Sequence, residues 1–511
     1  MSDFIPAVGI DLGTTFSVIA KLDAMGRPES LVNAEGDRTT PSVALFESGQ
    51  AVVGKEALKA ISSEANSIAL CAKRDMGHKV FHQALENKQY PPEVIEAFIL
   101  NKLRRDAMDH LGEFTKVVIT VPAYFDEVRR KATQDAGYMA GFEVLDIINE
   151  PTAAALAYGY LKGLLGKETK PENIMVYDLG GGTFDITIMN VCGSSFTTLA
   201  TDGDVQLGGY DWDYRLLDYV SEKFVQEYYL DPRDDVCTKG RLWRECEDAK
   251  RTLSARMKAT ITCDYKGFTK RVEVTREEFE RMTQDLLDRT RFTMVQTLKA
   301  AKLEWSDISC VLLVGGSSRM PMVRSMLKQV TGKEPDASAA ADEAVAWGAA
   351  LHAGNLISMS QNNPSTFSIS NINSHSLGVV GTDPATKLAR VGVLIPRNTK
   401  LPATVRRVFR TQKQNQRSIL VQIVEGESSS PDSCTTIGFC KVPQLPPNLP
   451  AGTQIQVSFN YSPDGRLRVS VDIPSINTAV TEEFTRENNL PKPLLDGWRR
   501  YISGKEATDY M

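Results

Sequence analysis

Hydrophobic and polar positions follow two different periodicities along the chain, and the change between them falls near residue 357. Before this point, short β-branched apolar runs alternate with longer stretches in which apolar residues recur at helical spacing. The apolar runs predict strands at residues 7–10, 117–121, 174–177 and 311–314. The longer stretches predict helices at residues 126–141, 151–160, 210–229 and 277–302. Strands that alternate with helices are typical of an α/β domain, which we place at residues 1–356.

Beyond this point the apolar residues alternate with polar ones at every second position. Residues 357–374 are rich in Ser, Asn and Gln and are interpreted as a polar linker. Apolar and polar residues then alternate at 454–460, and a Ser-Pro-Asp-Gly turn at 462–465 leads into a second alternating run. This pattern indicates an antiparallel hairpin with one buried face, and it predicts an all-β, sandwich-type module at residues 375–473.

Residues 474–511 are predicted to form a short tail with one amphipathic helix. Its apolar residues have the spacing i, i+1, i+4, i+7, i+8 and are Leu494, Leu495, Trp498, Tyr501 and Ile502. Two interpretations stay open at this point: the apolar stripe packs against the β module, or it binds a partner protein.

Composition and charge exclude several classes of protein. Of the 511 residues, 42% are hydrophobic and 24% are charged, so a small disulfide-stapled fold and global disorder are both excluded. The 59 Lys and Arg against 64 Asp and Glu give a net charge of −5, which offers no general attraction to nucleic acid or anionic membranes. We therefore expect no nucleic-acid and no membrane partner, and we interpret Arg406, Arg407 and Arg410 as the solvated face of one strand.

The cysteines, the histidines and the first residues all fit a cytoplasmic protein. Eight cysteines are scattered along the chain without a Cys-x-x-Cys pair, which indicates reduced thiols. His78 and His82 have helical spacing but lack the Glu of the metalloprotease pattern, so they are interpreted as surface residues. No basic stretch precedes the first apolar run, and Asp11 interrupts that run, so neither secretion nor membrane insertion is expected.

Three glycine-rich turns each follow an apolar strand, and the first two look like one device used twice. They read GIDLGTT at 9–15, YDLGGGTFD at 177–185 and LVGGSSR at 313–319. Glycine lets consecutive main-chain N–H groups converge on phosphate oxygens, and an Asp at the end of the preceding strand can hold Mg²⁺ through waters. Two such turns from two halves of a molecule would clamp a polyphosphate between them. Neither a P-loop nor a dinucleotide-binding Gly-x-Gly-x-x-Gly motif occurs.

Together with further segments, these turns resemble the heat-shock protein 70 family of ATP-dependent chaperones, within the actin and sugar-kinase superfamily. The resemblance covers about residues 7–473 and is densest up to residue 352. The further matching segments read VPAYF at 121–125, NEPTAAA at 149–155, LGG at 207–209, EDAKRTLS at 247–254 and DEAVAWG at 342–348. The resemblance implies a two-lobed, actin-like ATPase domain with a duplicated core, followed by the all-β domain as the peptide-binding part.

The resemblance also implies roles for individual residues. Catalysis is implied for Asp11, Lys73, Glu150, Asp178 and Thr183. Binding of ATP or ADP is implied for Gly13, Thr14, Thr15, Phe16, Gly180, Gly181, Gly182, Thr183, Gly208, Gly209, Glu247, Lys250, Arg251, Ser254, Gly315, Gly316, Ser317, Arg319 and Asp342. Asp11 and Asp178 would hold a hydrated Mg²⁺, with K⁺ as a further cation, and Pro122 and Arg130 match the family's relay to the interdomain surface. From the residues alone, Lys73 could be part of a solvated pair with its neighbour Arg74.

Four features depart from the family's pattern. About sixteen residues separate Lys73 from the segment at 90–93, where most members carry a longer insert, so one upper lobe is expected to be trimmed as in compact bacterial members. Tyr210 stands where the family usually has an acidic residue near the metal, and the polar stretch at 358–366 replaces a leucine-rich acidic linker. The forty residues after Val471 are too few for the family's helical lid.

The sequence therefore predicts an ATP-binding and ATP-hydrolysing molecular chaperone that acts in protein folding and the stress response and binds unfolded or extended apolar polypeptide segments. A J-domain co-chaperone and a nucleotide exchange factor are implied as partners. The departures keep an alternative open, namely a nucleotide-gated scaffold or co-chaperone that binds ATP with little turnover and weak interdomain coupling. A small-molecule kinase or a filament-forming actin relative would leave the β module unexplained.

Overall fold

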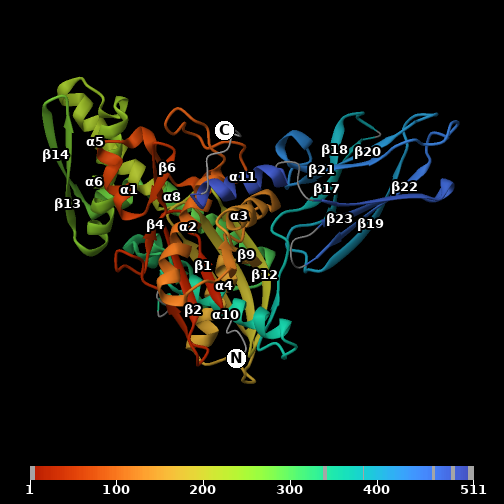
Figure 1. Ribbon diagram of the computed structural model, residues 1–511, viewed down its shortest axis with the longest axis horizontal. Helices are drawn as coiled ribbons and strands as arrows, with labels where there is room; N and C mark the ends of the chain where they lie inside the picture. The colour runs from red at the N-terminus through yellow and green to blue at the C-terminus, as the bar shows by residue number, and fades with distance from the viewer. Residues whose placement is uncertain (1–5, 338–341, 384, 463–466, 485–489, 505–511) are drawn as a thin grey trace.

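Two related β-sheets form the centre of the first part of the chain (Figure 1). The computed structural model describes residues 6–337, 342–383, 385–462, 467–484 and 490–504. The first sheet has the order β3-β2-β1-β8-β9, with β4 paired to β2, and its strands are β1 (Val8–Asp11), β2 (Phe16–Leu22), β3 (Pro28–Ser30), β4 (Thr40–Pro41), β8 (Lys116–Val121) and β9 (Glu143–Asn149). The second sheet has the order β15-β10-β11-β12-β16, and its strands are β10 (Glu172–Leu179), β11 (Phe184–Cys192), β12 (Ser195–Asp204), β15 (Ile308–Val314) and β16 (Ser368–Ser370).

The two sheets repeat one topology. In the first sheet, β1, β2 and β3 form an antiparallel meander, and β8 lies parallel to β1 on its other side. In the second sheet, β10, β11 and β12 form the same meander, and β15 lies parallel to β10. We call the parts built on these sheets the first lobe and the second lobe. The predicted α/β fold with a duplicated core is thus confirmed.

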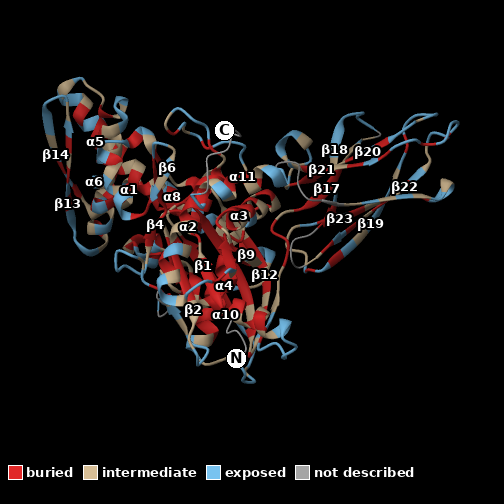
Figure 2. Cartoon of the chain, in the orientation of Figure 1, coloured by how far each residue is buried: buried red, intermediate tan, exposed pale blue. Residues whose placement is uncertain are grey.

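Helices α4 (Glu150–Leu161) and α10 (Ala344–Ser360) lie between the two sheets, where Figure 2 shows burial to be most complete. Helix α10 packs on β1, β2 and β8 of the first lobe, and α4 packs on β10 and β12 of the second lobe. The two helices approach closely because Gly348 has no side chain; a Cβ atom there would lie 1.8 Å from the carbonyl oxygen of Ala153. This contact fixes the spacing of the lobes.

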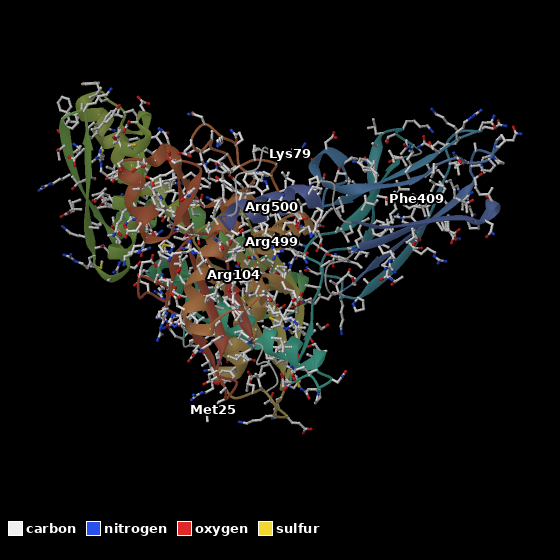
Figure 3. All side chains as sticks on the ribbon, in the orientation of Figure 1. Met25, Lys79, Arg104, Phe409, Arg499 and Arg500 are labelled. Atoms are coloured by element: carbon white, nitrogen blue, oxygen red, sulfur yellow. The ribbon has the colours of Figure 1, made fainter. Side chains whose placement is uncertain are left out.

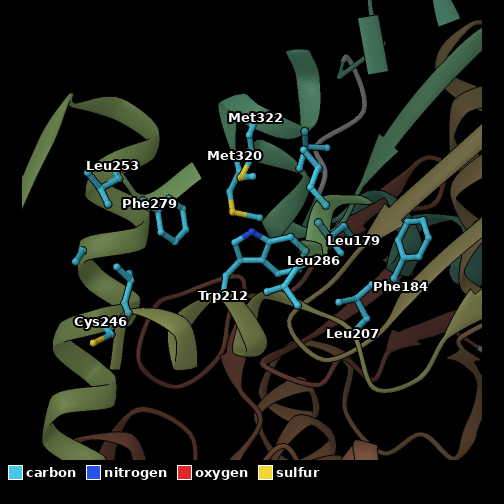
Figure 4. Packing of buried hydrophobic residues seen from close by; sticks show 14 of the residues in the cluster. Leu179, Phe184, Leu207, Trp212, Cys246, Leu253, Phe279, Leu286, Met320 and Met322 are labelled. Carbon is cyan, nitrogen blue, oxygen red and sulfur yellow. The ribbon is translucent and has the colours of Figure 1, made fainter. Parts of the chain in front are cut away.

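Each lobe carries its own helices. The first lobe has α1 (Lys55–Lys59), α2 (Pro92–Leu111) and α3 (Glu127–Met139), together with a small sheet of β5 (Val43–Glu47), β6 (Gln50–Val53) and β7 (Ile68–Leu70). The second lobe has α5 (Gly209–Tyr228), α6 (Val236–Ala255), α7 (Arg276–Met282), α8 (Gln284–Ala300) and α9 (Pro321–Thr331), with a hairpin of β13 (Lys258–Tyr265) and β14 (Phe268–Thr275). Its core surrounds Trp212 of α5, a fully buried side chain that Figure 4 shows beside Met320 and Leu286. Burial of this indole anchors the start of α5.

The β module consists of two four-stranded antiparallel sheets. One sheet has the order β18-β17-β20-β21, with β17 (Leu377–Thr382), β18 (Ala389–Ile395), β20 (Ile419–Glu425) and β21 (Thr435–Val442). The other has the order β19-β22-β23-β24, with β19 (Ala403–Arg410), β22 (Gln454–Tyr461), β23 (Leu467–Ile473) and β24 (Thr478–Phe484). Alternate apolar residues of both sheets form one buried core between them, as the period-two pattern predicts.

Polar contacts join the β module to the first and second lobes. The Ser374 hydroxyl donates to the Ala123 carbonyl oxygen, and Nε2 of His375 lies 2.9 Å from the Tyr124 carbonyl oxygen. The Tyr461 hydroxyl donates to Glu127 over 2.8 Å. These residues bring the β module against the turn between β8 and α3.

The tail helix α11 (Lys492–Ile502) packs on the first lobe, so the prediction that it packs against the β module is wrong. Figure 1 shows α11 across the top of α3, and Leu495, Trp498 and Ile502 complete the core around α2 and α3. The Trp498 ring lies 6.0 Å from that of Tyr90. Arg500, which Figure 3 labels on the same helix, is exposed. Amphipathic periodicity identified the buried face of the helix but not the surface that this face covers.

Several predicted boundaries differ from the observed elements. The helix predicted at 277–302 is two helices, α7 and α8, which are separated at Thr283. Helix α10 continues four residues past the boundary placed at 356, and within the predicted linker β16 pairs with β12 of the second lobe. The β module extends beyond residue 473, because β24 adds a strand to β23. The division into domains otherwise stays a prediction.

All eight cysteines carry free thiols, as their scattered spacing suggests. Over the stretches that the structure describes, no helix is both long enough and apolar enough to cross a membrane.

Candidate functional site

A cavity of about 780 Å³ lies between the two lobes and collects most of the residues singled out from the sequence. Those that line it are Asp11, Gly13, Thr14, Thr15, Phe16, Lys73, Glu150, Asp178, Gly180, Gly181, Thr183, Glu247, Lys250, Arg251, Ser254, Gly315, Gly316, Ser317, Arg319 and Asp342. They come from both lobes and from widely separated parts of the chain. A ligand in this cavity would therefore contact both halves of the duplicated core.

The two duplicated turns face each other at the base of the cavity. The first turn connects β1 to β2 and the second connects β10 to β11, so each is the hairpin turn at the same point of its sheet. A Cβ atom on Gly181 would lie 1.7 Å from Oγ1 of Thr15, so only glycine allows this approach. Thr14 and Thr15 of the first turn and Gly181 and Thr183 of the second line the cavity. Glycine-rich turns with threonine hydroxyls suit the binding of phosphate oxygens.

Gly182, Gly208 and Gly209 do not line the cavity but support its wall from behind. A Cβ atom on Gly208 would lie 2.5 Å from the amide nitrogen of Gly182. The amide of Gly209 donates to the carbonyl oxygen of Gly180 over 3.0 Å. These glycines hold the second turn against the start of α5, so a role in shaping the turn fits them better than a direct contact.

A buried ion pair lies beside the two turns. Lys73 stands on a short 3-10 helix, Ala72–Asp75, and Glu150 is the first residue of α4 directly after β9. Nζ of Lys73 lies 2.6 Å from Oε1 of Glu150 and also donates to the Leu12 carbonyl oxygen, and the side chain is 3% exposed. Burial alone would lower the pKa of Lys73, but the charges of Glu150 and Asp11 outweigh it and raise this pKa. Lys73 therefore stays charged, and its burial and its contact with Glu150 exclude the solvated pair with Arg74.

Three buried aspartates approach the same point and hold protons more strongly than free aspartates. Burial and the charge of Glu150 raise the pKa of Asp11 to about 7 and the pKa of Asp178 well above its usual value. Burial raises the pKa of Asp185 to about 8, although the Tyr124 amide donates to its Oδ1 over 3.1 Å. A cation bound beside these carboxyl groups would neutralise their negative charge and favour their deprotonated form.

Asp185 is a candidate functional residue that the sequence analysis quoted in its motif but did not assign. Its Oδ2 is buried without a hydrogen-bond partner, and the residue is 2% exposed beside the Asp178 turn. The available signal was its place at the start of β11, directly after the second turn, where a carboxylate is an unusual residue for a buried strand.

These carboxylates fit a hydrated magnesium ion better than a directly bound metal. Within the described residues, no three His, Cys, Asp or Glu side chains converge as a direct metal site. An ion that keeps its water shell needs only oxygen acceptors at water distance, and Asp11 and Asp178 supply them from the ends of β1 and β10. Asp185 does not line the cavity and is therefore not counted among these acceptors.

The second lobe also supplies a further wall of the cavity. Helix α6 presents Glu247, Lys250, Arg251 and Ser254 on one face, and the turn after β15 presents Gly315 to Arg319. Lys250 pairs with Asp213 over 2.7 Å, and Arg319 pairs with Asp342 over 2.6 Å. The Arg251 guanidinium lies 5.5 Å from the ring of Phe16 in the first lobe, so this contact spans the cavity entrance.

Tyr210 lies in the cavity wall, where the family pattern led us to expect the loss of a carboxylate. Its ring packs 4.6 Å from that of Tyr214, and the Arg74 guanidinium lies 5.4 Å above it. The neighbouring Asp211 pairs with Arg74 over 3.0 Å. A carboxylate is therefore present one residue later, but Asp211 forms an ion pair with Arg74 and does not line the cavity.

Pro122 and Arg130 lie between the cavity and the β module and do not line the cavity. Arg130 donates to Oδ1 of Asn149, the residue before Glu150, over 2.6 Å, and to the Ala123 carbonyl oxygen over 3.2 Å. Ala123 is also the residue that Ser374, directly before the β module, contacts. A relay role for Pro122 and Arg130 stays a prediction that this position makes physically reasonable.

Comparisons with known proteins agree with this architecture. The sequence model of the family described as Hsp70 protein matches residues 7–493. The chain is 38% identical to the chaperone protein DnaK of Metamycoplasma hominis over 493 residues, which cover 95% of this chain and 80% of that protein. It is 39% identical to the chaperone protein DnaK of Thermotoga maritima over 507 residues, covering 97% of this chain and 83% of that protein. It is 38% identical to the chaperone protein DnaK of Halobacterium salinarum, over 91% of this chain and 72% of that protein.

Proposed function

Because the chain belongs to the Hsp70 protein family, we propose that it is an ATP-hydrolysing molecular chaperone that binds unfolded or extended apolar polypeptide segments. The observation that carries this proposal is the cavity in which both duplicated turns, the Lys73–Glu150 pair and the buried aspartates meet. The alternative of a scaffold with little turnover is not favoured, because the relatives named above are chaperones.

In the proposed reaction a water attacks the terminal phosphoryl group of ATP in line, and the protein supplies position and charge rather than a covalent intermediate. We assign the turns around Thr15 and Thr183 to the phosphates and the wall formed by α6 to the adenosine. Lys73 places its ammonium group where negative charge develops, and Glu150 orients both Lys73 and the water. Asp11 and Asp178 would hold a hydrated Mg²⁺, which supplies charge neutralisation on the phosphate oxygens when it is bound.

Phosphate release tests this assignment. The rate of phosphate release at saturating ATP is compared among four proteins: the unaltered chain, Asp178→Asn, Lys73→Ala and the exposed-lysine control Lys299→Ala. ATP binding by each protein is measured separately. We expect Asp178→Asn and Lys73→Ala to release phosphate about a hundredfold more slowly, because each removes a charge that acts in the transition state. The control should match the unaltered chain. If all four proteins bind ATP and are equally inactive, the chain is not an ATPase.

The proposal extends to partners, ions and location. We place the binding of unfolded polypeptides in the β module, and we add a J-domain co-chaperone and a nucleotide exchange factor as regulators, which phosphate release in the presence of each would test. K⁺ is proposed as a second cation beside Mg²⁺. The free thiols support a reducing compartment, and we propose the cytoplasm.

A further inference from the structure

One segment of the β module has a charge opposite to that of the whole chain. The 41 residues from 384 to 424 contain no Asp or Glu, although acidic residues exceed basic ones in the chain as a whole. The nine basic residues of this segment are Lys387, Arg390, Arg397, Lys400, Arg406, Arg407, Arg410, Lys413 and Arg417. The segment spans β18, β19 and nearly all of β20. Three of its basic residues, Arg406, Arg407 and Arg410, lie in β19, so this strand carries more positive charge than β18 or β20.

Strand β19 lies at the edge of its sheet and offers free main-chain groups. It pairs with β22 on one side only, from Ala403 opposite Tyr461 to Arg410 opposite Gln454. On its other side no described strand is hydrogen-bonded to it. A strand edge of this kind can accept an extended polypeptide as an additional strand, through the same main-chain hydrogen bonds that hold a sheet together.

The side chains along β19 alternate between basic and apolar. Arg406, Val408 and Arg410 lie on the outer face, and Val408 is 50% exposed. Arg407 and Phe409 lie on the other face, where Figure 3 labels Phe409 between the two sheets. The pattern along the outer face of the edge is therefore cation, apolar residue, cation.

The cations of β19 are not neutralised within the described parts of the molecule. Arg406 donates to the Ser458 hydroxyl over 3.1 Å, and Arg410 donates to the Gly452 carbonyl oxygen over 3.2 Å. Arg407 donates to a carbonyl oxygen of β18 over 2.8 Å. These acceptors are neutral and orient the guanidinium groups without cancelling their charge, so an incoming carboxylate would find ordered, unpaired cations.

Charged side chains on an edge strand can also serve only to prevent sheets from associating edge to edge. That explanation does not account for the exposed Val408 between the two arginines, because an exposed apolar residue on an edge promotes association. A nucleic-acid surface is a second alternative. Among the residues of this module whose burial the structure describes, the exposed large apolar side chains are Leu388, Val393, Val408 and Leu420, and none is an aromatic residue on which a base could stack.

We propose that the free edge of β19 binds extended polypeptide segments with acidic side chains two positions before and two positions after an apolar one. This inference rests on the proposed binding of polypeptides by the β module and adds the class of segment that it takes. In a strand paired to β19, the two acidic residues would stand opposite Arg406 and Arg410, and the apolar residue would stand opposite Val408. Opposite charges across a strand pair stabilise it and like charges destabilise it, so the same segment with basic residues should bind more weakly.

Fluorescence anisotropy with three labelled heptapeptides tests the proposal on the 511-residue chain in the presence of ADP. The peptides share a central Leu within a Ser and Thr background and carry Glu, Gln or Lys at positions two before and two after it. We expect the Glu peptide to bind about tenfold more tightly than the Lys peptide, with the Gln peptide between them, and the difference to shrink as salt rises.

The double variant Arg406→Gln/Arg410→Gln should lose this preference. The control Arg105→Gln/Lys299→Gln makes the same change of net charge on the surface of the two lobes and should keep the preference.

If the Gln or Lys peptide binds as tightly as the Glu peptide, the acidic preference is wrong while polypeptide binding stands. If no peptide binds, polypeptide binding itself fails. A single-stranded oligonucleotide that binds more tightly than the Glu peptide would make this edge a nucleic-acid surface. The peptide series on the unaltered chain decides the preference even if the double variant does not fold.

Discussion

One buried carboxyl near the cavity lacks the partners that a buried charge needs. Glu96, on α2, is 1% exposed, and its Oε2 has no hydrogen-bond partner. Burial raises the pKa of Glu96 to about 8, and the charge of Lys73 offsets this effect only in part. The folded protein therefore keeps a proton on this carboxyl at neutral pH.

This proton makes stability depend on pH. The unfolded chain releases it near pH 4.5 and the folded chain near pH 8, so folding takes up a proton between these values and stability falls as the pH rises. Glu96→Gln removes the penalty, and it should raise the free energy of unfolding at pH 8 by roughly 3 to 5 kcal/mol while changing it little at pH 5. Urea unfolding at both pH values measures the effect, with the exposed Glu113→Gln as the control. Equal pH dependence in the unaltered chain and in Glu96→Gln would contradict this account.

At the residue scale, the sequence was informative where a motif ties a residue to a turn. Asp11, Thr15 and Asp178 could be placed because each follows or belongs to a glycine-rich turn after an apolar strand. Glu96 could not, because its importance comes from burial against residues that are distant in the chain, and no local pattern reports such burial. Asp185 directly follows the second turn, so its place in that motif was a signal that could have assigned it.

At the element scale, helix α11 shows what periodicity does and does not determine. The spacing of its apolar residues predicted an amphipathic helix, which is present. The surface that it covers depends on which other face is left apolar. Here that face includes Phe98 of α2 and Tyr90, which precedes α2. Tyr138 of α3 adds a polar anchor, since its hydroxyl donates to Asp496 and its ring lies 3.9 Å from the ammonium group of Lys492.

We expect α11 to stabilise the first lobe. Trp498→Ala removes a large side chain that is 8% exposed and should lower the free energy of unfolding by about 3 kcal/mol, with faster amide exchange in α2 and α3. Hydrogen exchange and urea unfolding measure both effects. Arg500→Ala, on the exposed face of the same helix, is the matched control and should change neither. If Trp498→Ala exchanges in α2 and α3 like the unaltered chain, the helix contributes no stability to this lobe.

At the scale of the whole molecule, the contacts between the β module and the lobes lie close to the nucleotide cavity. Arg397 of the β module pairs with Asp202 of the second lobe over 3.0 Å, and His375 reaches the turn that follows β8 in the first lobe. Arg130 connects the same turn to the residue before Glu150. A change at the cavity can therefore reach the β module through few contacts. The sequence predicted both folding units, but their docking depends on single polar residues in loops, which carry no periodic pattern.

The central claim is that ATP hydrolysis and polypeptide binding belong to one coupled molecule. The most direct measurement is the affinity of the 511-residue chain for a labelled apolar peptide, titrated once with saturating ATP and once with saturating ADP. Coupling of ordinary strength predicts dissociation constants that differ at least fivefold between the two nucleotides. Equal peptide affinity in ATP and ADP would contradict the account, because the nucleotide cavity and the β module would then act independently.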